Sequence, residues 1–387
     1  MSERIISNPK DLVRCAKCVM PETQESIMFN GDGVCNICRN VEFKDDKIDW
    51  VAKKNEFLDL ISKYKGKYEY DCIVPFSGGK DSTYTLYSLV VDYGLKPLVV
   101  SYDHHMYRPQ TVKNREKTLK KLGVDFVSYR TNWHLVKDLM RVGLERKGNI
   151  YWYEETGIFA YPMHMAIKFN VPFVIWGEPS AEYSAYYDYD DSEEVDETRF
   201  NMFVNMGITA QDMVGFLDNK DFTLNDLKFH IYPDRGDLKK IGCRSVCLGS
   251  YQPWDVKRQV EVIKKEIGWE GDHVEGVSQE NNYEKVEDML QGVQDYLKYI
   301  KRGYGRMSHL LSIDIRNGRL TREKALEMLD KWEGLRPASL DVLLGWLGID
   351  EEKFYEITKR HTVKPWSHNP ENTKKGEPLP DMKYWVK

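Results

Sequence analysis

The chain has 387 residues, of which 41% are hydrophobic and 30% are charged, and its formal net charge is −5. This composition is ordinary for a globular protein long enough for two domains, and it lacks the basic excess typical of proteins that bind nucleic acid. No run approaches the roughly 18 apolar residues of a membrane span, and the first residues lack the apolar core of a signal peptide. We therefore expect a cytoplasmic protein, in which the seven cysteines stay reduced.

Two Cys-x2-Cys pairs stand near the beginning of the chain. Cys15 and Cys18 form one pair, Cys35 and Cys38 the other, with sixteen residues between the pairs. This spacing is typical of structural zinc sites, because each tight turn aims two thiolates at one ion and four protein ligands leave no position for water. We predict a structural Zn²⁺ in a module of residues 1–45. An iron–sulfur cluster on the same four ligands is the alternative.

Residues 48–180 alternate between helix and strand patterns. The helical patterns lie at residues 50–64, 81–94, 111–123 and 134–147. The strand patterns, short and rich in β-branched residues, lie at residues 71–76, 96–103, 124–130 and 171–177. Strands that alternate with helices, and that are apolar enough to be buried on both faces, predict an α/β fold with a doubly wound, mostly parallel sheet.

The remainder of the chain is less regular. Residues 181–254 are rich in aromatic and acidic residues, and the acidic stretch at 188–197 is typical of a solvated loop. Helical patterns return at 285–303, 321–334 and 339–348, before a proline-rich tail. The predicted organisation is therefore a zinc module at 1–45, an α/β domain at 46–254, a helical domain at 255–362 and a tail at 363–387.

A polar loop stands between the first predicted strand and the helix that follows it. Its six residues are Ser77, Gly78, Gly79, Lys80, Asp81 and Ser82. The exposed N–H groups at the start of a helix attract anions, and two glycines let the backbone approach an anion closely. An aspartate suits such a site if it binds Mg²⁺ that accompanies the anion, or if it caps the loop's own amides. The loop therefore predicts a site for a phosphate chain with its metal.

The loop lacks the Walker pattern G-x-x-x-x-G-K-[ST]. It resembles instead the S-G-G-x-D-S fingerprint of the PP-loop (N-type) ATP pyrophosphatases, and the resemblance covers about residues 70–180. In that family the loop grips the β- and γ-phosphates of ATP as a departing pyrophosphate, and an oxygen of the substrate is adenylated. The resemblance implies ATP and Mg²⁺ as cofactors, residues 77–82 as the ATP-binding loop, and Lys80 and Asp81 as catalytic residues.

Polar residues follow two other predicted strands. Asp103 and His104 end the second strand, and Glu178 and Glu182 follow the fourth. Parallel sheets of this kind bind their ligands outside the carboxyl ends of the strands. Asp103 is therefore a candidate ATP contact, and His104, Glu178 and Glu182 are candidates for contact with a substrate or a metal. The alternative is that all four are ordinary residues of strand-end loops.

The order of features along nearly the whole chain resembles the N-acetyl sugar amidotransferases. The features are the Cys-x2-Cys-Val-Met-Pro opening at 15–21, the loop at 77–82, the stretch Gly-Ser-Tyr-Gln-Pro-Trp-Asp at 249–255 and the helical end. The resemblance implies a role in lipopolysaccharide or related surface-sugar biosynthesis, in which an acetamido group becomes an acetamidino group while ATP yields AMP and pyrophosphate. The implied substrate is a UDP-linked diacetamido uronic acid of O-antigen, or a nonulosonic acid.

Ammonia for such a reaction has no evident source within the sequence. None of the seven cysteines stands in a G-x-C-x-G elbow, and Met1 is followed by Ser2 rather than by a cysteine. The resemblance implies a separate glutaminase with a barrel-type subunit that delivers ammonia. We expect the helical C-terminal region, or the tail with Trp366 and Trp385, to provide its docking surface.

Two other functions compete with this interpretation. The first is a tRNA-modifying PP-loop enzyme such as a tRNA thiolase, in which Cys243 and Cys247 would transfer sulfur. The net acidic charge and the absence of a module rich in Lys and Arg argue against it. The second is a zinc-supported scaffold that binds ATP without producing AMP. Cys72 lies inside an apolar strand pattern and is predicted to be a core residue.

Overall fold

A single parallel sheet organises the α/β part of the chain. The computed structural model describes residues 4–179 and 194–385. Five strands lie in the order β3-β2-β1-β4-β5, and all four neighbouring pairs are parallel. Their bounds are β1 Cys72–Pro75, β2 Pro97–Asp103, β3 Asp125–Arg130, β4 Phe173–Trp176 and β5 Arg244–Cys247. The predicted fold class and its four strands are confirmed.

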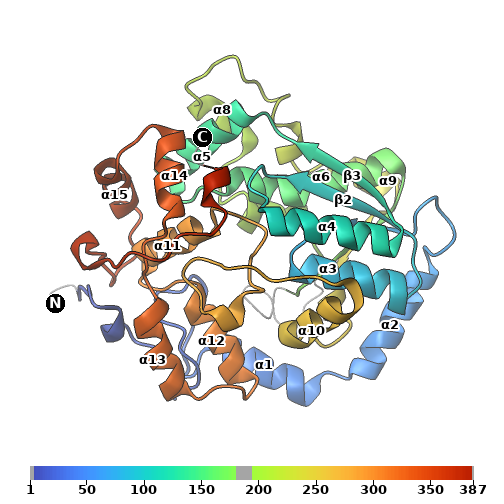
Figure 1. Cartoon of the computed structure of the whole chain (residues 1–387). Helices are drawn as coiled ribbons and strands as arrows, with labels where there is room; N and C mark the ends of the chain where they lie inside the picture. The colour runs from blue at the N-terminus through green and yellow to red at the C-terminus, as the bar shows by residue number, and fades with distance from the viewer. Residues whose placement is uncertain (1–3, 180–193, 386–387) are drawn as a thin grey trace.

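Both faces of the sheet are buried, because successive residues of each strand point to opposite sides. Ile73 and Val174 belong to a cluster with α5 (Trp133–Lys147) and α6 (Trp152–Phe169). Val74 and Ile175, their sequence neighbours, belong to a second cluster with α2 (Trp50–Ser62) and α3 (Lys80–Tyr87). Figure 1 shows the sheet between these layers of helices. The doubly wound arrangement follows directly from the two-sided apolar runs.

The remaining helices complete the layers and the C-terminal region. Those before the last strand are α1 Asn36–Lys47, α4 Pro109–Leu122, α7 Glu197–Arg199, α8 Ala210–Phe216 and α9 Arg235–Lys240. Those after it are α10 Val256–Ile267, α11 Gln291–Arg302, α12 Arg306–Arg316, α13 Arg322–Trp332, α14 Ser339–Leu347 and α15 Glu351–Lys359. None of the described helices is both long and apolar enough to cross a membrane.

Several elements of the structure differ from the sequence-based expectation, and helices α1, α8 and α9 are among those that no pattern predicted. Helix α6 and strand β5 were not predicted, and residues 285–290, predicted to be helical, are not. Lys285 has a φ of 51°, which a lysine rarely adopts and which is incompatible with a right-handed helix. Helix α11 therefore begins only at Gln291, and the irregular segment before it reaches the loop at 77–82.

The N-terminal segment packs on the C-terminal helices and not on the sheet. The Ile6 N–H donates to the Pro365 carbonyl at 2.8 Å, and the Ser367 N–H donates to the Ile6 carbonyl at 2.7 Å. Figure 1 shows this N-terminal segment in blue beside α12 and α13. Trp366, expected to be available for docking, is instead 2% exposed, and its Nε1–H donates to the Ile300 carbonyl. Trp366 is a core residue, so it is withdrawn as a docking contact.

Candidate active site

The backbone amides of the loop at 77–82 donate to the loop's own serine hydroxyls, and two of them share one acceptor. The N–H groups of Ser77 and Gly78 donate to the Ser82 Oγ at 3.2 and 3.1 Å, and the Gly79 N–H donates to the Ser77 Oγ at 3.2 Å. Gly78 has a φ of 87°, which makes this convergence possible at low cost for a glycine. Convergent amides at the start of α3 are what a phosphate site requires.

Neighbouring elements approach the two glycines too closely for any side chain. A Cβ on Gly78 would lie 2.2 Å from the Cγ of Arg115 on α4, and a Cβ on Gly79 would lie 2.6 Å from the Glu287 Oε2. The Gly78 carbonyl also accepts a hydrogen bond from the Trp269 Nε1–H at 3.0 Å. The loop is therefore packed against the region that follows α10, which makes the C-terminal part of the chain a wall of the site.

Lys80 ties the loop to that C-terminal region. The Lys80 side chain is 4% exposed, and its Nζ lies 2.7 Å from the Asp81 Oδ2 and 2.9 Å from the Glu284 Oε2. Burial alone would lower the pKa of Lys80, but the carboxylates of Asp81 and Glu284 raise it well above its usual value. Burial would likewise raise the pKa of Glu284, but Lys80 and Arg306 lower it to about 2. Lys80 is thus a fully charged, ion-paired link and not a free cation.

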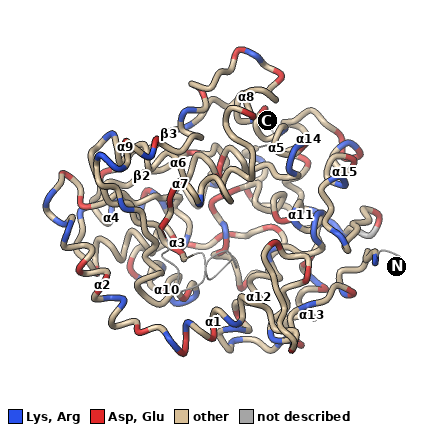
Figure 2. Tube along the Cα trace, turned by 180° about the vertical axis from the view of Figure 1, so that it is seen from behind, with Lys and Arg blue, Asp and Glu red and all other residues tan. Residues whose placement is uncertain are grey.

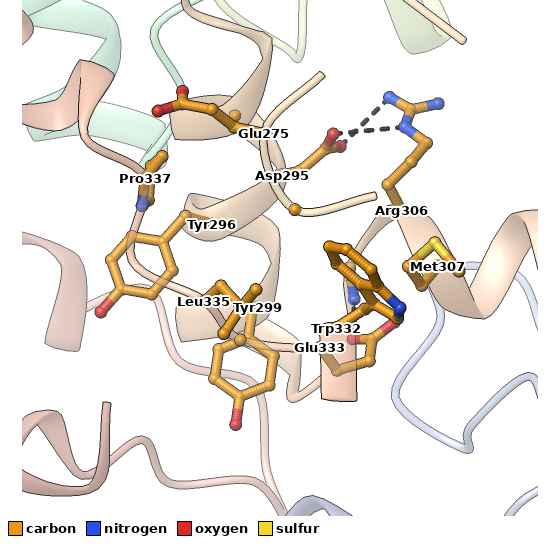
Figure 3. A pocket seen from close by; sticks show the side chains of 14 residues that line it. Glu275, Asp295, Tyr296, Tyr299, Arg306, Met307, Trp332, Glu333, Leu335 and Pro337 are labelled. Atoms are coloured by element: carbon orange, nitrogen blue, oxygen red, sulfur yellow. Dashed lines mark hydrogen bonds and ion pairs between the residues drawn. The ribbon is translucent and has the colours of Figure 1, made fainter. Parts of the chain in front are cut away.

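A cavity of about 580 Å³ opens at the carboxyl ends of β1 and β4. From the α/β part it is lined by Ser77, Gly79, Asp81, Ser82, His104, Tyr151, Glu154, Glu178 and Cys247, among others. From the C-terminal part it is lined by Lys285, Glu287, Asp288, Lys298, Lys301 and Arg306, among others. Arg306 is held by Asp295, with the Arg306 Nη2 3.1 Å from the Asp295 Oδ1. Figure 3 shows this pair from a neighbouring pocket to which both residues also belong. The site is therefore shared between two parts of the chain that are distant in sequence.

Asp81 and Glu178 place carboxylate oxygens together in this cavity. The Asp81 Oδ1 is buried and has no hydrogen-bond partner among the described residues. Burial, followed by the negative charge of Asp81, raises the pKa of Glu178 to about 7. Oxygen ligands from carboxylates are those that Mg²⁺ prefers, and a divalent cation would relieve this repulsion. Asp81 and Glu178 could therefore hold Mg²⁺.

The other strand-end residues predicted from the sequence have different outcomes. His104 and Glu178 line the cavity, whereas Asp103 does not. The Asp103 Oδ2 lies 2.5 Å from the Arg130 Nη2, and its Oδ1 accepts from the His105 N–H at 2.9 Å. Burial would raise the pKa of Asp103, but these two partners lower it below its usual value. Its predicted contact with ATP therefore stays a prediction. Glu182 and most of the acidic stretch at 188–197 lie outside the described residues.

Most polar residues of the cavity were missed from the sequence, and three of them illustrate why. Glu154 stands on α6, and Lys285 and Asp288 stand on the irregular segment before α11. No short-range motif marks them, since tertiary packing alone brings them together. One sequence feature, weaker than a motif, does point to Glu154. It directly follows the apolar residues Trp152 and Tyr153, in a helix that is otherwise rich in core residues. A carboxylate in such a position requires a partner.

Lys285 faces the acidic side of the cavity. Burial would lower its pKa, but Glu287 and Glu178 raise it above the usual value. Its positive φ of 51° is a conformation that surrounding contacts must impose, and such positions concentrate at functional sites. Lys285 is therefore well placed to bind a negatively charged ligand in the cavity, between Asp81 and the C-terminal wall.

The four N-terminal cysteines form one buried cluster. Their sulfurs lie within 4.8 Å of one another. The Cys15–Cys38 and Cys18–Cys35 Sγ distances are 4.0 and 3.8 Å. Zinc–sulfur bonds of about 2.3 Å place the sulfurs of a tetrahedron roughly 3.8 Å apart, so these spacings fit one tetrahedral ion. The predicted four-cysteine metal site is confirmed as an arrangement of ligands.

The second cysteine pair does not form such a cluster. Among the described residues, Cys243 and Cys247 belong to no group with metal-ligand spacing. Burial raises the pKa of Cys243 to about 12, the opposite of what a nucleophilic thiolate needs. Cys247 ends β5 and lines the cavity. The geometry therefore gives no support to sulfur transfer by this pair.

Comparison with known families identifies the C-terminal wall of the site. Residues 278–378 match the family described as "LPS biosynthesis protein WbpG-like, C-terminal domain". This part of the chain is therefore similar to the C-terminal domain of WbpG-like proteins. This match confirms the family resemblance expected from the sequence. The matched region supplies Lys285, Glu287 and Asp288 to the lining of the cavity.

Other similarities are partial or remote. The uncharacterized protein MJ1599 of Methanocaldococcus jannaschii is 28% identical over 134 residues, which are 34% of this chain and 48% of that relative. The match thus spans about half the length of this relative. NMN synthetase from Francisella tularensis covers 80% of this chain and 97% of its own, at 13% identity and a TM-score of 0.34. The U34-tRNA thiolase NcsA from Methanococcus maripaludis, with its [4Fe-4S] cluster, covers 81% and 88%, at 14% identity and a TM-score of 0.31. Similarities this remote carry no information about the substrate.

Proposed function

We propose that the protein is an ATP-dependent N-acetyl sugar amidotransferase of bacterial surface-polysaccharide synthesis. The observation that supports this most directly is the shared cavity, in which an S-G-G-K-D-S loop faces a WbpG-like domain. In the proposed reaction the acetamido oxygen of the sugar attacks the α-phosphorus of ATP and pyrophosphate leaves. Ammonia then adds to the resulting imidate carbon, and AMP departs to leave an acetamidino group.

The described residues suit the charges that this reaction creates. The N–H groups of Ser77 and Gly78 would stabilise the leaving pyrophosphate if a phosphate oxygen takes the place of the Ser82 Oγ, to which both now donate. Lys285 would meet the charge that develops on the transferred phosphoryl group. Asp81 and Glu178 would hold Mg²⁺, which neutralises phosphate charge when bound, and the four-cysteine cluster would hold a structural Zn²⁺. The protein acts by positioning and electrostatics, so no nucleophilic side chain is required.

The proposed sugar is acidic, and helix α11 contributes two lysines to the cavity wall that could bind its negative charge. Burial lowers the pKa of Lys298 and lowers that of Lys301 to about 8. The lowered pKa values mean that nearby carboxylates do not fully offset the cost of burying these two ammonium groups. A bound anion would stabilise their charged forms. A uronic carboxylate, a diphosphate or the acid group of a nonulosonic acid would supply it. We propose the UDP-linked diacetamido uronic acid as the first substrate to test.

Ammonia is proposed to come from a separate glutaminase with a barrel-type subunit. The expectation rests on the sequence alone, and the burial of Trp366 removes one of its suggested contacts. Added ammonium ions can replace the ammonia that the partner would deliver, so the reaction can be tested without the partner.

The test incubates the purified protein with Mg-ATP, ammonium and the UDP-diacetamido uronic acid. Mass spectrometry follows the exchange of one oxygen for an NH group in the sugar, while AMP and pyrophosphate are quantified. The Asp81→Asn variant should lose AMP formation by about 100-fold or more. Asp92→Asn is the matched control, because Asp92 lies at the far end of the same helical segment, bonded to Ser88.

The outcomes separate the candidate functions. Stoichiometric AMP with the mass change supports the amidotransferase. AMP without a change in the sugar would contradict this substrate and redirect the test to nonulosonic acids. AMP that forms only when tRNA is added would favour the thiolase alternative. The charge pattern does not favour tRNA, since Lys and Arg are interspersed with Asp and Glu along the chain (Figure 2).

A further inference from the structure

A second polar cluster lies in the cavity and has no role in the chemistry described above. A ring nitrogen of His104 and carboxylate oxygens of Glu154 and Asp288 lie within 4.8 Å of one another. His104 is 1% exposed, Glu154 9% and Asp288 5%. The His104 Nε2 has no hydrogen-bond partner among the described residues, whereas Asp288 interacts with the Tyr151 hydroxyl and with Glu154. A buried imidazole nitrogen without a partner is costly unless a ligand meets it.

The backbone fixes which kind of atom His104 presents. The Met106 N–H donates to the His104 Nδ1 at 3.2 Å, so Nδ1 carries the lone pair. Burial lowers the pKa of His104 to about 3, which keeps the ring neutral. A neutral imidazole has one N–H, and here it must stand on Nε2. His104 therefore presents a hydrogen-bond donor to the cluster.

The two carboxyl groups together present both a donor and an acceptor. Burial and the neighbouring Asp288 raise the pKa of Glu154 well above its usual range. Burial raises the pKa of Asp288 to about 6, while the Leu290 N–H donates to its Oδ1 at 2.7 Å. At neutral pH the pair therefore holds one proton, with Glu154 as a carboxylic acid and Asp288 as a carboxylate.

This distribution of protons decides between two kinds of ligand. A metal ion would need the lone pair of the His104 Nε2, which the Met106 hydrogen bond leaves on the other nitrogen. An ammonium ion would meet the Nε2–H with its own hydrogens. A secondary amide suits the cluster, because its carbonyl oxygen accepts from His104 and its N–H donates to Asp288.

We propose that His104, Glu154 and Asp288 form a subsite that binds an acetamido group of the sugar substrate. The inference rests on the proposed function and deepens it, since it assigns the part of the cavity that recognises the N-acetyl substituent. Asp288 comes from the WbpG-like domain and Glu154 from α6, so the amide is held between the two parts of the chain. A sugar with a free amine in place of the acetamido group is rejected, because it leaves the Nε2–H of His104 without an acceptor.

The test measures equilibrium binding by calorimetry, without ATP, so that it is independent of turnover. The two ligands are the UDP-diacetamido uronic acid and its diamino counterpart. His104→Leu should weaken binding of the acetylated sugar by about 10- to 100-fold, while His104→Gln, which keeps an N–H donor, should weaken it less than about fivefold. Asp288→Asn should lose as much as His104→Leu. Glu116→Gln, a change at an exposed glutamate of α4 outside the cavity, should bind as the wild type does.

The readouts also separate this inference from its alternatives. A wild type that binds the sugar, with His104→Leu and Asp288→Asn binding equally well, would overturn the subsite and leave the proposed function intact. A wild type that forms AMP with tRNA and binds neither sugar would overturn both. The third readout is a titration with Mn²⁺. If the wild type binds Mn²⁺, and if Asp288→Asn and His104→Gln each abolish that binding, the cluster is a metal site and not an amide subsite. An unchanged KM for ATP in each variant shows that the loop at 77–82 is intact.

Discussion

Replacement of Glu284 by glutamine (Glu284→Gln) is expected to destabilise the fold by about 3 kcal/mol at neutral pH. Glu284 is buried, 2.9 Å from the Lys80 Nζ and 3.5 Å from the Arg306 Nη1. Its pKa is lowered from 4.5 to about 2, and each pKa unit corresponds to about 1.4 kcal/mol. Removal of one partner from a buried pair costs about 3–5 kcal/mol in other proteins, which agrees in size.

The pH dependence of this effect distinguishes the ion pair from a simple packing defect. Because the folded state lowers the pKa of Glu284, its contribution is present in full above the ordinary value of 4.5 and is lost as the pH falls towards 2. The difference in the free energy of unfolding between the wild type and Glu284→Gln should fall to about 2 kcal/mol at pH 3.5.

The assay is urea unfolding of both proteins at pH 7 and pH 3.5, with free energies taken from the transition midpoints and slopes. Glu280→Gln serves as the matched control, because Glu280 is an exposed glutamate on the same segment. It should change stability by less than about 0.5 kcal/mol. A Glu284→Gln effect below about 1 kcal/mol at pH 7, or one that does not change with pH, would refute the reasoning.

Three further changes have definite expected outcomes. Gly78→Ala forces a φ of 87° on alanine and places a Cβ 2.2 Å from Arg115, so it should cost about 2–5 kcal/mol, measured as a lower melting temperature. Gly215→Ala is its control, because a Cβ there meets nothing within 4 Å. Cys15→Ser should remove the metal bound at the four-cysteine cluster, measured by elemental mass spectrometry, and retained metal would contradict the site. Glu178→Gln should raise the Mg²⁺ concentration needed for half-maximal AMP formation by at least about tenfold, and an unchanged requirement would exclude Glu178 as a ligand.

The sheet was predictable because its strands bury residues on both faces. The runs at 71–76, 96–103 and 171–177 are mostly apolar, and each lies where the structure has a strand. Strand β5, Arg244–Cys247, has only four residues and begins with Arg and Ser, so no periodic pattern exposed it. Here tertiary pairing with β4 decides the conformation.

The site was predictable only where local sequence determines geometry. The loop at 77–82 and the four cysteines depend on spacing over a few residues, and both are assembled as predicted. The Lys285 segment has a helical pattern, yet the pairing of Glu284 with Lys80 holds it in an irregular conformation. Glu154 and Asp288 stand 134 positions apart by sequence number. Such long-range contacts leave no local trace in a single sequence.

The packing of the N-terminal cysteines has a consequence for synthesis of the chain. The Arg322 Nε donates to the carbonyls of Cys15 and Cys18 at 3.1 and 3.0 Å, across a sequence separation of 307 residues from Cys15. At translation rates of about 5–20 residues per second, Arg322 follows Cys15 out of the ribosome after roughly 15–60 s. During that interval the four thiols have no cover from α12 and α13. An ion bound early would hold the two turns together until the helices arrive, so metal supply during translation should affect the yield of folded protein.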